Sequence, residues 1–105
     1  MEKGKIKMKI SETKFTKEFR HELTSKGWLT FKINERFASG FPDLICMKKG
    51  EIMFLEVKSD KNKLTKLQKY TLKQIKEERF IAKVIKFKSQ LDKNEPISWT
   101  EEDIK

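Results

Sequence analysis

A predicted β-hairpin constrains the fold of this chain more than any other feature of its sequence. Residues 43–47 (DLICM) and 51–58 (EIMFLEVK) are apolar, strand-like runs, and the short turn between them, residues 48–50, ends in glycine. Two such runs around a short glycine-containing turn predict antiparallel neighbours in a sheet. Because side chains alternate between the two faces of a strand, Glu56 and Lys58 should project together from one face, while the apolar residues of this run point into the packed face.

Periodic apolar residues predict one helix before this hairpin and one after it. Phe15, Phe19 and Leu23 recur every four residues and predict an amphipathic helix that ends near Gly27. Residues 65–79 predict a second helix, which begins after a threonine that can act as its N-cap.

Further strands and two terminal segments complete the predicted order of elements. Residues 28–33 (WLTFKI) and 80–87 (FIAKVIKF) are rich in β-branched and aromatic residues and predict two more strands. Residues 1–10 alternate lysine with methionine and isoleucine, which indicates a short strand or a loose basic arm. In the C-terminal extension, residues 88–105, we expect a turn and then one last helical turn that packs Trp99 on the body of the domain.

The length and the charge of the chain narrow its class. A chain of 105 residues suits one compact domain, residues 1–105, and is too short for two. Lys and Arg number 25 against 16 Asp and Glu, which gives a net charge of +9. Such a surplus favours a polyanionic partner, because neutralised phosphates release their counterions. We therefore expect a nucleic-acid partner; the alternative is a surface charge that serves only solubility.

The residues that other chemistries require are scarce. The one cysteine, Cys46, cannot form an internal disulfide, and its place in an apolar run indicates a core residue rather than a nucleophile. The one histidine, His21, cannot build a zinc site with a single cysteine. No apolar run approaches the ~20 residues of a membrane span, and nothing resembles a signal peptide. We therefore expect a soluble, cytoplasmic protein.

Three charged residues of the predicted hairpin are the first candidates for chemistry. Asp43 begins the strand that neighbours Glu56 and Lys58, so two carboxylates and a lysine can converge at one edge of the sheet. Carboxylates bind hard cations such as Mg²⁺, which polarise a phosphoryl group and generate hydroxide, and a lysine can steady the developing charge. From geometry alone, a cross-strand salt bridge is slightly the better interpretation.

The surrounding residues change this balance. The runs 39–45 (SGFPDLI) and 54–58 (FLEVK) resemble the PD-(D/E)XK nuclease superfamily, in which Pro-Asp precedes a short hairpin and Glu-x-Lys follows it. Downstream, residues 64–68 (LTKLQ) resemble the helix of the VRR-NUC branch, where a glutamine follows the Glu-x-Lys strand. Archaeal Holliday-junction resolvases share this core. The resemblance covers residues 12–87 and implies a restriction-endonuclease-like α/β fold of order α-β-β-β-α-β, with a central mixed sheet flanked by helices.

The resemblance also implies roles for residues of this chain. Asp43 and Glu56 would bind Mg²⁺ or Mn²⁺, the backbone carbonyl of Val57 could add a further oxygen, and Lys58 would be the catalytic lysine. Gln68 would lie on the second helix near the metal and orient water or phosphate. The alternative for Gln68 is a solvated helix residue.

The family also places a glutamate on the first helix, where this sequence offers three. Glu12 falls on the helix face that carries the core phenylalanines, whereas Glu18 falls at its border and Glu22 lies toward the wrong end. We choose Glu12 as the additional catalytic and metal-binding carboxylate, with Glu18 second. The alternative for Glu12 is a carboxylate stabilised by the helix dipole alone.

Basic residues near the predicted site indicate a surface that binds the DNA backbone with little sequence readout. These candidates are Arg36, Lys48, Lys49, Lys61, Lys63, Lys66 and Lys69. The sequence therefore predicts a Mg²⁺- or Mn²⁺-dependent endonuclease acting on DNA, with selectivity for branched DNA as an open refinement. A homodimer and a phage or prophage origin are further expectations. The alternative function is a non-catalytic nucleic-acid-binding module on the same fold.

Overall fold

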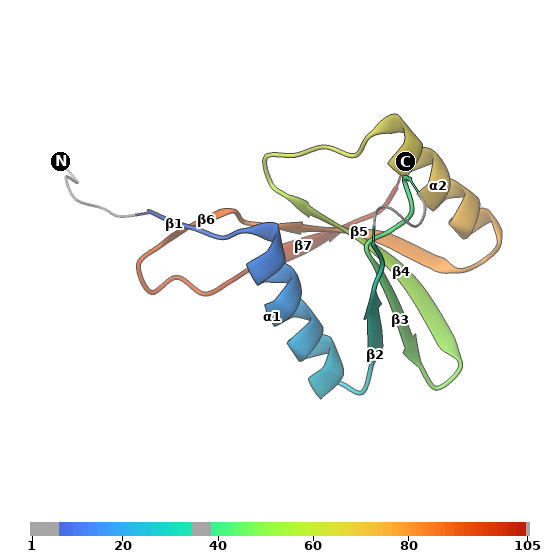
Figure 1. The fold of residues 1–105 in the computed structure, drawn as a ribbon, viewed down its shortest axis with the longest axis horizontal. Helices are drawn as coiled ribbons and strands as arrows, with labels where there is room; N and C mark the ends of the chain where they lie inside the picture. The colour runs from blue at the N-terminus through green and yellow to red at the C-terminus, as the bar shows by residue number, and fades with distance from the viewer. Residues whose placement is uncertain (1–6, 35–38, 105) are drawn as a thin grey trace.

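A five-stranded mixed sheet with one helix on each face forms the centre of the protein (Figure 1). The computed structural model describes residues 7–34 and 39–104. The helices are α1 (Glu12–Ser25) and α2 (Lys66–Glu77). The strands are β1 (Lys7–Lys9), β2 (Leu29–Lys32), β3 (Leu44–Lys48), β4 (Glu51–Ser59), β5 (Ile81–Phe87), β6 (Gln90–Asp92) and β7 (Trp99–Glu102). From α1 to β5 the order is the predicted α-β-β-β-α-β, and the architecture is consistent with a restriction-endonuclease-like fold.

The strands of the main sheet lie in the order β2-β3-β4-β5-β7. Only β4 and β5 are parallel, because the chain returns between them through α2, as a parallel connection requires. The predicted hairpin is confirmed: Lys48 pairs with Glu51, and the intervening Lys49 and Gly50 both have positive φ, 47° and 86°. Two such residues are the signature of the tight turn that matches the twist of a hairpin.

Both helices begin and end where the sequence indicates. The Ser11 side chain accepts a hydrogen bond from the Lys14 backbone N–H at 3.0 Å and caps the start of α1. At the other end, Gly27 has a φ of +93°, and the N–H of Trp28 returns to the Leu23 carbonyl at 3.0 Å. The glycine therefore ends the helix in the left-handed conformation that favours it.

Two apolar clusters hold the layers together. The larger lies between α1 and the sheet, where Phe15 stacks on Phe87 with ring centroids 4.6 Å apart. The smaller lies between α2 and the sheet and is centred on Leu72, Ala82 and Val84. Helix α2 covers the part of its sheet face that β4 and β5 form. The end of β4, where the sequence predicts the active site, therefore lies under the start of this helix.

The C-terminal extension departs from the sequence-based expectation. Residues 99–102 form β7 rather than a helical turn, because pairing with β5 supplies hydrogen-bond partners that an isolated turn cannot. Trp99 does pack on the body, edge-on to Phe15 and Phe19 at 5.7 and 5.2 Å. The expected turn after residue 88 contains β6, which pairs with β1 in a two-stranded ribbon that projects beside α1 (Figure 1). Residues 7–9 of the N-terminal segment are thus a strand, whereas residues 1–6 lie outside the described residues.

Candidate active site

The site forms where the ladder between β3 and β4 stops. The last pair is Leu44 with Leu55, and continuing the register would set Pro42 opposite Val57. Proline has no N–H to donate, so the ladder ends there. The Asp43 carboxylate instead accepts a hydrogen bond through Oδ2 from the Val57 backbone N–H at 2.7 Å. The Pro-Asp pair therefore ties the start of β3 to the end of β4 through a side chain rather than through the backbone.

Glu56 is an almost fully buried carboxylate, only 2% exposed. Its Oε2 accepts a hydrogen bond from Gln68 Nε2 at 3.2 Å and lies 3.9 Å from Lys58 Nζ. Its Oε1 receives no hydrogen bond from a backbone or side-chain donor of the described residues. A buried carboxylate oxygen without a partner is costly unless a proton or a cation satisfies it.

The surroundings of Glu56 raise its pKa to about 9. Burial makes the largest contribution, and the negative charge of Asp43 adds to it. Lys58 lowers the pKa, but a hydrogen bond shared with the Asp43 carboxyl and the charge of Glu12 raise it again. In the metal-free protein, Glu56 therefore holds a proton at neutral pH. A divalent cation beside Asp43 and Glu56 would remove the repulsion that keeps this proton in place.

The donor set fits a hard divalent cation. Asp43 and Glu56 offer carboxylate oxygens, and the Val57 carbonyl belongs to the residue between Glu56 and Lys58. In residues 7–34 and 39–104, no three or more His, Cys, Asp or Glu side chains are grouped to hold a metal. A closed zinc-type site is therefore absent from the described part of the chain. Mg²⁺ commonly uses one or two protein carboxylates and completes its shell with water and substrate phosphate.

The three first-helix glutamates lie in different places. Glu12, at the start of α1, lines a cleft together with Asp43, and its charge raises the pKa of Glu56. Glu18 and Glu22 line a separate cleft with Trp99. The structure thus brings Glu12 toward the predicted site and not Glu18 or Glu22, while metal binding by Glu12 stays a prediction.

Gln68 performs two structural tasks at the start of α2. Its Oε1 accepts from the Thr65 backbone N–H at 2.9 Å, and Thr65 Oγ1 accepts from the Gln68 N–H at 3.1 Å, which completes a capping box. Since Oε1 is used in the cap, Nε2 is left to donate to Glu56. Gln68, which is partly exposed, therefore holds Glu56 in place, while its role in orienting water or phosphate stays a prediction.

The loop before Pro42 and Asp43 requires a glycine at position 40. The φ of Gly40 is +79°, and a Cβ at this position would lie 2.5 Å from Leu67 Cγ. Only glycine lets the loop approach the first turn of α2 this closely without a shift of Leu67. The loop and helix together line a cleft that reaches Asp43, Lys58 and Gln68.

The predicted DNA-binding residues divide into groups. Lys63 and Lys69 line a second cleft that Lys58 also reaches, whereas Lys61 and Lys66 are exposed on the same loop and helix start. Lys48 and Lys49 lie at the opposite end of β3 and β4 and are not brought to the site. Lys48 Nζ donates to the Lys26 carbonyl at 2.7 Å, a structural contact. Arg36 lies outside the described residues.

Lys86 was not among the sequence candidates, although it also lines the second cleft. It faces Lys58 across the parallel pair β4–β5. The sequence around Lys86 shows only that this lysine alternates with apolar residues along a predicted strand. That pattern could not reveal Lys58 as its neighbour, because the register of a parallel pair is set by the crossover helix.

Cys46 is a core residue, as its sequence context indicated. It is fully buried, and burial raises the pKa of its thiol to about 11, against a smaller lowering by Arg20. The thiolate that a nucleophile requires is therefore scarce at neutral pH. Among the described residues, no helix combines the length and the apolar character needed to span a membrane.

The fold is that of an α/β protein with a restriction-endonuclease-like architecture. The family model of the VRR-NUC domain matches residues 7–88, and the chain belongs to this family. A search of curated protein sequences finds no match to the chain. Membership indicates a nuclease-type function with DNA as the partner. The match spans β1 to β5 and ends before β6 and β7.

Proposed function

We propose that this protein is a Mg²⁺- or Mn²⁺-dependent endonuclease that hydrolyses phosphodiester bonds of DNA. The observation that carries the proposal is the buried carboxylate of Glu56, which lies beside the partly buried Asp43 and beside Lys58. Glu56 has one oxygen that receives no hydrogen bond from a donor of the described residues, and its pKa is about 9. Structural carboxylates in a core are normally fully bonded, so this arrangement supports a role in binding a cation.

Each residue would contribute a separate task. Asp43, Glu56 and the Val57 carbonyl would hold the cation, which when bound polarises the phosphoryl group and lowers the pKa of water. Lys58, 3.9 Å from Glu56, would orient the attacking water and steady the charge that develops on the phosphate. Gln68 keeps Glu56 in place, and Glu12, which lines a cleft with Asp43, would add a further carboxylate.

Several lysines lie near the site and could contact the substrate. Lys61, Lys63, Lys66 and Lys69 follow Lys58 on the loop and the first turns of α2. Contacts between lysines and phosphates carry no sequence information, so we infer recognition of the DNA backbone and of DNA shape. Selectivity for branched DNA and a phage origin stay predictions from the resemblance.

We also propose that two copies act together. On its face of the sheet, helix α2 leaves β2 and β3 uncovered. There Leu29 pairs with Met47, and the side chains of Leu29, Met47 and Phe31 are exposed. A second copy related by two-fold symmetry would bury this face and place two sites on two strands of a branched substrate. Sedimentation should show a dimer that Phe31→Glu converts to a monomer; a wild-type monomer at working concentrations would refute the dimer.

The decisive experiment incubates labelled linear and branched DNAs with Mg²⁺ or Mn²⁺. Wild type should cleave, and Lys58→Ala should lose about two orders of magnitude or more in rate while remaining folded. Lys83→Ala is the matched control, since Lys83 lies on the neighbouring β5 and pairs with Glu101 away from the site. Binding that persists in EDTA with no cleavage under any divalent metal would instead favour the non-catalytic module.

A further inference from the structure

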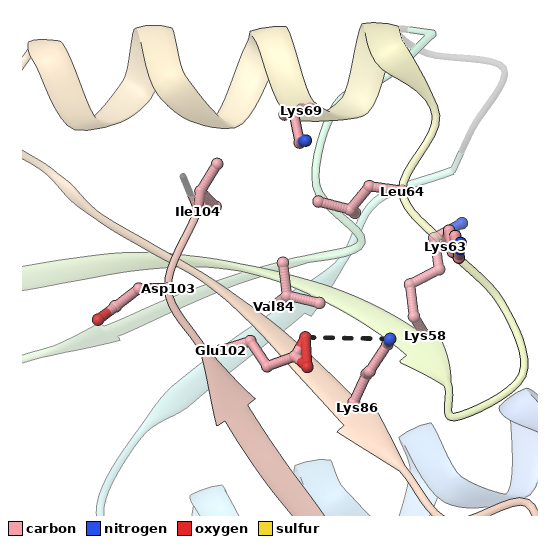
Figure 2. A pocket seen from close by; sticks show the side chains of 9 residues that line it. All are labelled: Lys58, Lys63, Leu64, Lys69, Val84, Lys86, Glu102, Asp103 and Ile104. Carbon is pink, nitrogen blue, oxygen red and sulfur yellow. Dashed lines mark ion pairs between the residues drawn. The ribbon is translucent and has the colours of Figure 1, made fainter.

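A second cleft opens beside the catalytic residues, between α2, β5 and the segment after β7 (Figure 2). Four lysines line it, and we call it the lysine pocket: Lys58, Lys63, Lys69 and Lys86. They come from β4, the following loop, α2 and β5. Figure 2 shows Lys69 pointing from the helix toward the sheet, across from Lys86 and Glu102. Lys58 also lines the cleft that reaches Asp43 and Gln68, which we call the catalytic cleft. The two clefts therefore adjoin.

Two of these lysines are crowded on one face of the sheet. Lys58 and Lys86 are register partners on the parallel strands β4 and β5. Like charges placed opposite each other destabilise a sheet unless anions compensate them. Each lysine has a carboxylate beside it, but at long range: Glu56 lies 3.9 Å from Lys58, and Glu102 lies 4.0 Å from Lys86. Both ammonium groups therefore keep much of their capacity to bind another anion.

The floor of the pocket is apolar, which strengthens its electrostatics. Val84 is buried at the base, Leu64 closes one side, and Ile104 packs into the cluster of Leu72 and Val84. Charges beside such a surface interact more strongly than they do in open water. Since Ile104 anchors the segment after β7, Glu102 is held at the rim, where its side chain remains half exposed.

We propose that the lysine pocket binds a second backbone phosphate of the DNA strand that occupies the catalytic cleft, with Lys86 as its main contact and Glu102 as the carboxylate that it displaces. The inference rests on the proposed function, because it extends the same DNA path. A strand whose scissile phosphate lies beside Lys58 must place its neighbouring phosphates along the adjoining surface. The pocket would fix the direction of the strand relative to Asp43 and Glu56, without reading a base.

The test measures binding rather than cleavage. Affinity for a short labelled DNA duplex is measured in EDTA over a range of salt concentrations. Lys86→Gln should reduce the salt slope by about 0.9 and weaken binding about eightfold at roughly 0.1 M salt, the effect of one lost phosphate contact. Glu102→Gln should act in the opposite direction and tighten binding. Opposite effects from two neighbours cannot both come from misfolding.

The same two strands carry a matched control on their other face. Lys83 and Glu101 form an ion pair at 3.2 Å, and strand alternation turns them away from the pocket. Lys83→Gln and Glu101→Gln should therefore leave the salt slope nearly unchanged. Three outcomes would refute the proposal that the lysine pocket binds a phosphate. They are equal effects of Lys83→Gln and Lys86→Gln, weaker binding by Glu102→Gln, and no DNA binding at all.

Neutral methylphosphonate linkages locate the phosphate concerned. At one position other than the scissile phosphate, a methylphosphonate should weaken the binding of DNA to wild type. The same replacement should cause no further loss of affinity for Lys86→Gln. Additive losses at every position would overturn the assignment. Failure of the nuclease proposal is distinguishable, because it would show as absence of cleavage by wild type in Mg²⁺ and Mn²⁺, whereas the pocket is judged in EDTA.

Discussion

Gln68 joins the start of α2 to the buried carboxylate of Glu56. Its Nε2 donates to Glu56 Oε2 at 3.2 Å, while its Oε1 accepts the Thr65 backbone N–H at 2.9 Å. One side chain therefore both caps a helix and orients the buried carboxylate that we propose for catalysis. This fixes the end of β4 against the first turn of α2 and couples local helix formation to the geometry of the site.

The two tasks of Gln68 can be separated by substitution. Gln68→Glu keeps an acceptor for the Thr65 N–H but loses the donor to Glu56 and adds a further carboxylate beside it. We expect thermal stability close to wild type and single-turnover cleavage slower by roughly tenfold to a hundredfold. Thr65→Ala should do the reverse, costing about 1 kcal/mol of stability with a smaller effect on rate. Unchanged cleavage by Gln68→Glu would contradict the positioning role.

The raised pKa of Glu56 predicts how stability depends on pH. The carboxyl has an ordinary pKa of 4.5 and a folded-state pKa of about 9. Between these values the folded, metal-free protein holds a proton that the unfolded chain has released. The free energy of unfolding should therefore fall as pH rises from about 5 to about 9. Glu56→Gln should remove this part of the fall, so that it exceeds wild type in stability most clearly near pH 9.

Thermal unfolding in EDTA across this pH range measures the effect. Adding Mg²⁺ should stabilise wild type increasingly as pH rises, because the cation competes with the proton, and should stabilise Glu56→Gln much less. Parallel pH profiles for the two proteins in EDTA would show that Glu56 is ionised in the folded state.

Gly40 and Gly50 provide a matched pair of glycine substitutions. Both have positive φ, +79° and +86°, so alanine is strained at either position. A Cβ at Gly50 meets nothing within 4 Å, whereas one at Gly40 would lie 2.5 Å from Leu67 Cγ. Gly50→Ala should cost about 1–2 kcal/mol with normal cleavage. Gly40→Ala should cost more and also slow cleavage, and adding Leu67→Ala should restore part of both, as denaturant titration and rate measurements would show.

Cys46 should be chemically silent in the native protein. Its thiol is buried with a pKa of about 11, so iodoacetamide at neutral pH should leave it unmodified, as judged by mass spectrometry. The unfolded chain should react fully. Cys46→Ala should cleave DNA at the wild-type rate. Rapid alkylation of the native protein would place this thiol outside the core.

Local pattern was sufficient to predict most of the fold and to place Glu56 and Lys58 together, whereas a catalytic role for these residues rests on the resemblance and stays a prediction. The four-residue spacing of phenylalanines marks α1, and period-two alternation places Glu56 and Lys58 on one face of β4. The resemblance then pointed to Gln68. Its exchange of hydrogen bonds with Thr65 and Glu56 could not be foreseen, since it depends on how α2 sits on the sheet.

What the sequence could not predict depends on contacts between distant segments. The segment after Ser98 pairs with β5 only because the sheet leaves that edge open, and a short run carries no such information. Lys58 and Lys86 become neighbours only because α2 connects the parallel strands β4 and β5. The β1–β6 pairing likewise joins residues about 80 positions apart, beyond any local periodicity.

Strand β7 has a further consequence for how the chain can be divided. It covers β5 along residues 84–87, whose backbone groups would otherwise line an open edge, a template for strand addition between molecules. The family match ends at residue 88, so a truncation drawn at that boundary would keep Asp43, Glu56, Lys58 and Gln68. Such a fragment would carry every residue proposed for catalysis and yet be prone to aggregate, because resistance to self-association resides in the segment beyond the shared domain.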